Sequence, residues 1–278
     1  MKSKSLLKKI TVHGGLIFFI GFLVFPLIWM LSTSFKPTPE IYSGHPTIFP
    51  KRISFEHYTA VITEEKVLQS IGNSFSIGII STIIVVLIAL PAAYALARFR
   101  SAFNNLVLGW ILTSQIFPAI LIMIPLYIVL RSMRMTNSLL GLTLVYVVWN
   151  LPFVLWMLHG YAKGIPADLE EAAAIDGATR TQIIYQVLMP LLLPAIGAAM
   201  LFAFISAWNE FFFALVLMKS PDSITLPVEL ARFTGMEGQA RTGPLAAASL
   251  IATIPSLALF GLMQKWFASG LLAGAVKN

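Results

Sequence analysis

The chain has 278 residues, of which 58% are hydrophobic and 11% charged, and its mean hydropathy is +0.83. Soluble domains are about 45–50% apolar and about 25% charged, so a soluble fold of this length could not bury its apolar side chains. The net charge of +7 does not indicate nucleic-acid binding, because the basic residues lie at the ends of apolar runs, and the lack of cysteine excludes disulfides and thiol chemistry.

Six apolar runs are long enough to cross a bilayer, which takes about 17–25 residues. They lack the strict alternation of a membrane β-barrel, and helices satisfy their own backbone groups in lipid. The sequence therefore predicts an all-α polytopic membrane protein with six transmembrane helices. These are expected at about Gly14–Ser34, Ile71–Ala97, Leu106–Leu130, Ser138–Gly160, Leu191–Met218 and Leu245–Phe267.

The first run follows a basic segment, as in a signal peptide, but it is longer than a signal core and no small-x-small site ends it. An uncleaved span is therefore favoured. The 19 lysines and arginines divide almost evenly between the two sides of the membrane. The charges beside the first helix usually decide the orientation of the chain in the membrane. Four lysines precede this helix, so the N-terminus is predicted to lie inside: Lys2, Lys4, Lys8 and Lys9.

Prolines punctuate the runs, at Pro26, Pro91, Pro118, Pro125, Pro152, Pro194 and Pro255. Kinks in a membrane bundle are tolerated where neighbouring groups satisfy the freed backbone. A role in helix shape is the favoured interpretation, and hinges in a moving pathway are the alternative.

The loop between the fourth and fifth runs, 163–190, carries a helix pattern of its own. Pro166 suits a first helical turn, and three acids follow where the helix dipole favours them: Asp168, Glu170 and Glu171. Alanines continue the helix, Gly177 can end it in the left-handed conformation, and Thr179 with Gln182 forms a capping box for a second helix. On these physical grounds alone, an interfacial helix without a partner remains as good an interpretation as a docking helix.

The same loop contains a spaced motif. Glu171-Ala172-Ala173 is followed after three residues by Gly177, and after nine more by Val187-x-Met189-Pro190. This pattern resembles the EAA motif of binding-protein-dependent ABC importer permeases, with Val187 and Met189 in place of Ile and Leu. Further stretches resemble the maltose-permease, MalG-like branch: Asn73-Ser74, Pro91 to Arg98, Trp208 to Phe211 and Gly270 to Lys277. The interval Leu226–Gly235 resembles members that carry maltose or trehalose.

The resemblance implies the type I ABC importer fold and a division of labour. Two permease subunits, this chain and a MalF-like partner, would form the pore for a sugar of the maltose or trehalose type. Two MalK-like ATPase subunits, using ATP and Mg²⁺, would bind the loop through Glu170, Glu171, Ala172, Ala173, Asp176 and Gly177. A periplasmic or lipid-anchored binding protein would deliver the sugar. The loop and the N-terminus would then be cytoplasmic in a bacterial or archaeal plasma membrane.

The expected organisation has three parts. Residues 1–69 hold the N-terminal segment, first span and external loop; residues 70–267 form the ABC transmembrane domain; residues 268–278 form a cytoplasmic tail. Polar residues at membrane depth are candidates for a substrate pathway, although hydrogen bonding between helices and interfacial anchoring are the favoured interpretation. The candidates are Gln115, Asn150, Trp208, Asn209 and Glu210.

The sequence does not indicate catalysis by this chain. It has no G-x-x-x-x-G-K-[ST] phosphate loop, and its four histidines are scattered, so neither a nucleotide, another cofactor nor a metal site is predicted. The alternative function is an ion-coupled secondary transporter or channel. Matching halves and several intramembrane charges would indicate that class, but no repeat is visible and only Glu210 is a serious candidate charge.

Overall fold

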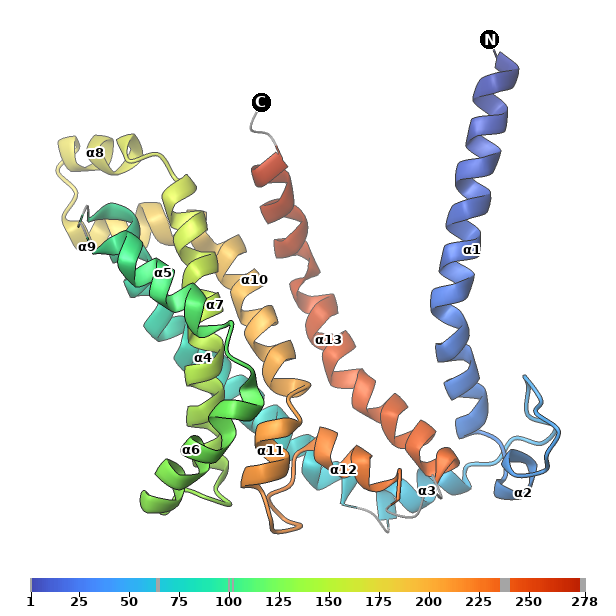
Figure 1. Cartoon of the computed structure of the whole chain (residues 1–278). Coiled ribbons are helices and arrows are strands. Elements are labelled where there is room, and N and C mark those ends of the chain that lie inside the picture. The colour runs from blue at the N-terminus through green and yellow to red at the C-terminus, as the bar shows by residue number, and fades with distance from the viewer. Residues whose placement is uncertain (1, 64–65, 100, 102, 236–240, 276–278) are drawn as a thin grey trace. The chain divides into compact units, whose positions relative to one another are not determined.

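The computed structural model describes residues 2–63, 66–99, 101, 103–235 and 241–275 and is all-helical over these ranges (Figure 1). Within these described ranges, five helices are long and apolar enough to cross a membrane, and one bent helix pair makes a sixth crossing if it counts as one span. The chain divides into two compact units: residues 1–68 with 229–253, and residues 69–228 with 254–278. Two long helices run through both units: α4 (Val67–Arg98) and α13 (Thr242–Ala275).

The first unit holds α1 (Lys2–Ser34), α2 (Thr38–Ile41) and α3 (Glu56–Thr63), together with most of α12 (Leu226–Arg232) and the start of α13. The apolar stretch of α1 from Val12 to Leu31 has its large side chains exposed within this chain. At the end of α1, the buried Lys36 donates its ammonium to the Thr47 carbonyl and lies 4.7 Å from the Trp29 ring centroid. This contact folds the following loop against α1.

The second unit is built on α4, α7 (Leu139–Gly164) and α10 (Met189–Trp208). Their shared core consists of valines and alanines from α4, valines and leucines from α7, and alanines from α10. Small residues let helix backbones approach closely, which is how membrane helices gain contact area. The core alanines of α10 are Ala195, Ala199 and Ala203.

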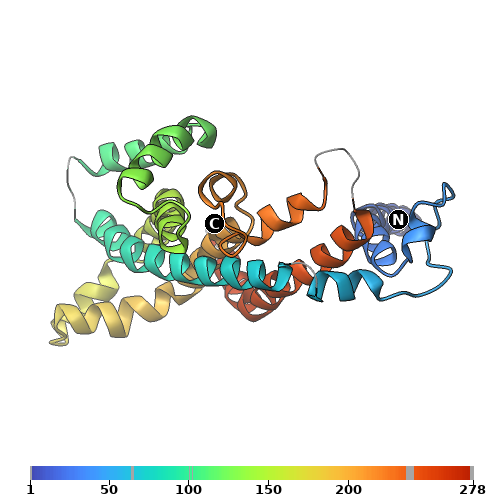
Figure 2. The same ribbon diagram turned by 90° about the horizontal axis from the view of Figure 1, so that it is seen from below.

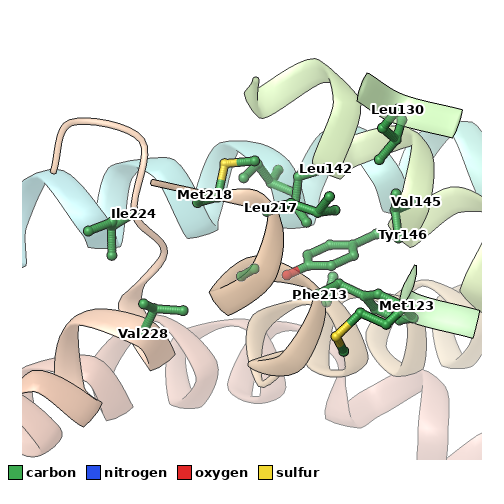
Figure 3. Packing of buried hydrophobic residues seen from close by; sticks show 13 residues of the cluster. Met123, Leu130, Leu142, Val145, Tyr146, Phe213, Leu217, Met218, Ile224 and Val228 are labelled. Atoms are coloured by element: carbon green, nitrogen blue, oxygen red, sulfur yellow. The ribbon is translucent and has the colours of Figure 1, made fainter. Parts of the chain in front are cut away.

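A second core in this unit joins α6 (Ala119–Ser132) and α7 to α11 (Phe212–Leu217). Figure 3 shows the Tyr146 ring surrounded by side chains from these helices, among them Met123, Phe213 and Leu217. Tyr146 is 1% exposed and Phe213 and Leu217 are 2% exposed, so one face of the short helix α11 is buried against the bundle.

The third predicted span is not a single straight helix, which corrects the prediction for Leu106–Leu130. It consists of α5 (Asn104–Ser114) and α6, and the chain bends by 94° between Leu106–Ser114 and Ala119–Ser132. Pro118 lies at the break, where it cannot donate a backbone hydrogen bond and disfavours helix geometry in the residue before it. Seen from below, α5 and α6 lie on one side of α4, and α8 (Asp168–Ile175) with the π-helix η1 (Ile183–Leu188) lies on the other (Figure 2).

The fifth span also differs from its predicted bounds, Leu191–Met218. The continuous helical segment runs from Arg180 to Trp208, and the chain breaks at residues 209–211 before α11. Its first turns are α9 (Arg180–Gln182) and a six-residue π-helix, η1 (Ile183–Leu188). The sixth helix, α13, extends to Ala275, so residues 268–275 of the predicted tail continue the helix, and residues 276–278 lie outside the described ranges.

Candidate functional site

The loop between the fourth and fifth runs forms the predicted short helix, α8 (Asp168–Ile175). It begins two residues after Pro166, and it ends in a Schellman motif. The Gly177 amide donates to the Ala174 carbonyl at 3.1 Å, and the Ala178 amide donates to the Ala173 carbonyl at 3.0 Å. Gly177 has φ +84°, so the left-handed conformation predicted for this glycine is confirmed.

A second helix follows directly, as the sequence predicts. The Thr179 hydroxyl accepts from the Gln182 amide, and the Gln182 side chain accepts from the Thr179 amide at 2.8 Å. This capping box starts α9, which leads through η1 into α10. The sequence does not predict the π-helix. Such turns are rare and are frequently found at functional sites.

None of the residues of α8 is buried. The Glu171, Ala172 and Ala174 side chains are exposed, and Ile175 is 86% exposed. The helix presents acids at its start, and its apolar Leu169 is 44% exposed. Such a surface is suited to contact with another protein. Asp176 and Gly177 are also exposed, so four of the six predicted coupling residues share an accessible segment, whereas Ala173 is half-buried and Glu170 is mostly covered.

Glu170 differs from the other acids of α8 because its side chain points into the unit. Its carboxylate accepts from the Tyr94 hydroxyl at 2.9 Å and forms an ion pair with the Arg98 guanidinium. The Arg98 and Glu170 side chains are only 14% and 16% exposed. Arg98 also donates to the Ile165 carbonyl at 3.0 Å. The sequence analysis singled out the stretch from Pro91 to Arg98 but did not pair it with Glu170.

Residues 86–272 match the family model of the binding-protein-dependent transport system inner membrane component. The chain belongs to this family. This permease is 40% identical over 265 residues to the diacetylchitobiose uptake system permease protein DasC of Streptomyces coelicolor, covering 95% of each chain. It is 35% identical over 277 residues to the trehalose/maltose transport system permease protein MalG of Thermococcus litoralis, covering 99% of each chain.

The fold is similar to that of a solved bacterial ABC transporter involved in the import of the acidic polysaccharide alginate. The two chains superpose with a TM-score of 0.80 at 24% identity, and the match covers 95% of this permease and 98% of that chain. The predictions of a MalG-like ABC importer permease, of an all-helical membrane fold and of a subunit that is not itself an enzyme are confirmed.

The permease places the predicted pathway residues in different surroundings. Glu210 lies in the break between α10 and α11, where its carboxylate accepts from the Tyr146 hydroxyl and the Phe213 amide, both at 2.9 Å, and from the Ala214 amide at 3.2 Å. Its two oxygens therefore cap the start of α11. The neighbouring Asn209 is exposed, and its amide donates to the Ile205 carbonyl at 2.9 Å.

Asn150 and Trp208 are both buried within the second unit. Asn150 is 3% exposed and donates to the Tyr146 carbonyl one turn earlier at 2.9 Å. Trp208 is 4% exposed and stacks on Phe204 with ring centroids 5.6 Å apart. Both contacts lie within a single helix, α7 for Asn150 and α10 for Trp208.

Gln115 is exposed at the end of α5 and lines a cavity of about 340 Å³ together with Trp149 and Phe213. The remaining lining is mainly aliphatic, from α6 and α7. The structure thus brings Gln115 near α7 at the break of the third span, while Asn150, Trp208, Asn209 and Glu210 are engaged mainly within the bundle. Among the described residues, no group of three or more acids or histidines could hold a metal ion.

Proposed function

We propose that this permease forms part of the translocation pathway of an ATP-driven importer for a di- or oligosaccharide and is driven by a separate ATPase through α8. The supporting observation is the state of α8: a capped helix between two spans, with no buried residue and an 86% exposed Ile175. The family membership agrees with a subunit that depends on a binding protein. The names of the two relatives, which carry diacetylchitobiose and trehalose or maltose, support a carbohydrate substrate.

The proposed complex contains this chain, a second MalF-like permease, two MalK-like ATPase subunits that use ATP and Mg²⁺, and a sugar-binding protein. In the proposed topology the N-terminus and α8 are cytoplasmic. Within the chain, residues 70–267 would be the transmembrane domain proper, with 1–69 and 268–278 as its flanking segments. The exposed residues Glu171, Ala172, Asp176 and Gly177, together with the half-buried Ala173, would meet the ATPase. Gln115 with Trp149 would face the pathway.

Cross-linking tests the docking of α8, and the lack of native cysteine makes single-cysteine variants unambiguous. Ile175→Cys should cross-link to the ATPase subunit in the assembled complex, whereas Leu87→Cys, exposed on α4 at membrane depth, should not. If a membrane-impermeant thiol reagent added outside intact cells labelled Ile175→Cys, the proposed topology would be overturned.

An uptake assay tests the substrate class. Cells expressing the complex should accumulate radiolabelled trehalose, maltose or diacetylchitobiose in a way that requires ATP and the binding protein. Uptake that persists with an inactive ATPase and collapses with a protonophore would instead support the ion-coupled alternative.

A further inference from the structure

We infer that Tyr94 and Arg98 are positioning residues that attach α8 to the end of α4, so that movement of α8 is passed to α4 as well as to α10. This inference rests on the proposed coupling role of α8. It assigns a further attachment to α8, besides its two covalent links to α7 and α9 and its packing against η1.

The attachment joins complementary ends of three helices. Arg98 lies in the last turn of α4, and it also donates to the Ile165 carbonyl at the end of α7. Glu170 lies in the first turn of α8. A cation is favourable at helix C-termini and an anion at a helix N-terminus. One ion pair therefore interacts favourably with the partial charges at the ends of α4, α7 and α8.

The spacing of Tyr94 and Arg98 on α4 allows both side chains to reach the carboxylate of Glu170. Tyr94 and Arg98 are four residues apart, which places them on the same face of the helix. Both reach the same carboxylate, since Tyr94 donates to one oxygen of Glu170 and Arg98 pairs with the other. Two donors on one rigid face fix the direction of the carboxylate as well as its distance.

The two adjacent acids of α8 therefore have separate roles. Glu170 is mostly covered and bonded within the unit, whereas Glu171, about 100° further around the helix, is exposed. Removing one member of a mostly covered ion pair leaves the other charge uncompensated, which is strongly unfavourable. Since α8 buries none of its residues, this side-chain cluster is its main hold on α4.

The test uses the complete complex reconstituted in nanodiscs with its ATPase and binding protein. The variants are Arg98→Gln, Glu170→Gln and the charge swap Arg98→Glu with Glu170→Arg. Lys163→Gln is the control for the loss of one positive charge at the same end of the unit. Each single variant should lower the ATPase stimulation by the binding protein about tenfold, a size usual for coupling between sites. The charge swap should recover only part of it, because it restores the ion pair but leaves the Tyr94 hydroxyl and the Ile165 carbonyl without their partners. Lys163→Gln should behave as the parent.

A distance measurement separates a positioning role from general destabilisation. Spin labels at Ala174→Cys on α8 and Leu87→Cys on α4, both exposed, should give one narrow distance that is the same without nucleotide and with trapped ATP. In Glu170→Gln this distance should broaden or change with nucleotide. A narrow, nucleotide-independent distance together with parental stimulation in the single variants would overturn the inference.

The cross-link from Ile175→Cys to the ATPase keeps the two proposals apart. Its absence in the parent complex would refute docking by α8 itself. Its presence in the parent and in Glu170→Gln, with stimulation lost only in the variant, supports the inference. Its loss in Glu170→Gln while the distance between α8 and α4 stays as in the parent would overturn the inference, because Glu170 would then act at the ATPase surface.

Discussion

Replacement of Gly177 isolates the contribution of one backbone conformation to the proposed coupling. Gly177 has φ +84°, and a Cβ built there meets no atom within 4 Å. Gly177→Ala therefore adds no clash, and its cost is the left-handed conformation of an L-residue, about 1–2 kcal/mol. Reduced freedom of the unfolded chain returns roughly 0.4–1 kcal/mol, which leaves about 1 kcal/mol, or a fivefold loss of the capped state.

Gly177→Pro is more severe because proline fixes φ near −65° and removes the amide that donates to Ala174. We expect stimulated ATPase activity to fall slightly for Gly177→Asn, several-fold for Gly177→Ala and almost completely for Gly177→Pro. Amide exchange of residues 169–180 should rise in the same order, while the amount of assembled complex stays constant. Equal activity of the glycine, alanine and proline forms would refute a role for this turn.

Three further predictions concern polar contacts elsewhere in the chain. Glu210→Ala should lower the free energy of unfolding by about 3 kcal/mol, because three donors lose a charged acceptor, and it should reduce assembly as much as transport. A thermal-shift assay that shows Glu210→Gln to be as destabilising as Glu210→Ala would contradict this prediction. Asn137 has φ 56° and its side-chain oxygen accepts from two amides and a hydroxyl of the loop after α11, so Asn137→Ala should cost about 2 kcal/mol and Asn137→Gly less, measured in the same way. Hydrogen bonds from the side chain and amide of Thr38 hold the pKa of Glu56 below its usual range. Protection of the Thr38 amide against hydrogen exchange, corrected for the intrinsic exchange rate, should therefore be full above about pH 4.3 and lost as the pH falls through the lowered pKa. Glu56→Gln should remove this pH dependence.

The local elements of the coupling loop could be predicted because each depends on neighbours in the sequence. The left-handed glycine and the capping box involve residues at most five positions apart, and both are present. The apolar runs likewise predicted where the long helices lie, since length and composition decide whether a helix suits a bilayer.

The partners of Glu170 could not be predicted in the same way. Arg98 is 72 positions away in the sequence, and only the packing of α4 against α7 and α10 brings the two charges together. The bent third span was missed for a different reason. Pro118, Pro125 and Pro152 all lie in apolar runs, yet only Pro118 marks a break, because the sequence does not show which freed backbone groups find partners.

The two interrupted spans of the second unit meet the same helix. The break in the third span places Gln115 in a cavity with Trp149 of α7, and the break in the fifth span places Glu210 against Tyr146, three residues earlier on α7. Irregular backbone at membrane depth is stable only where protein covers it or where it lines a cavity. Glu210 meets the first condition by capping α11, whereas Gln115 meets the second because its side chain lines the cavity and is exposed. We therefore propose that a sugar pathway runs past Gln115 and Trp149 rather than past Glu210, although the carboxylate is the more conspicuous polar group in the sequence.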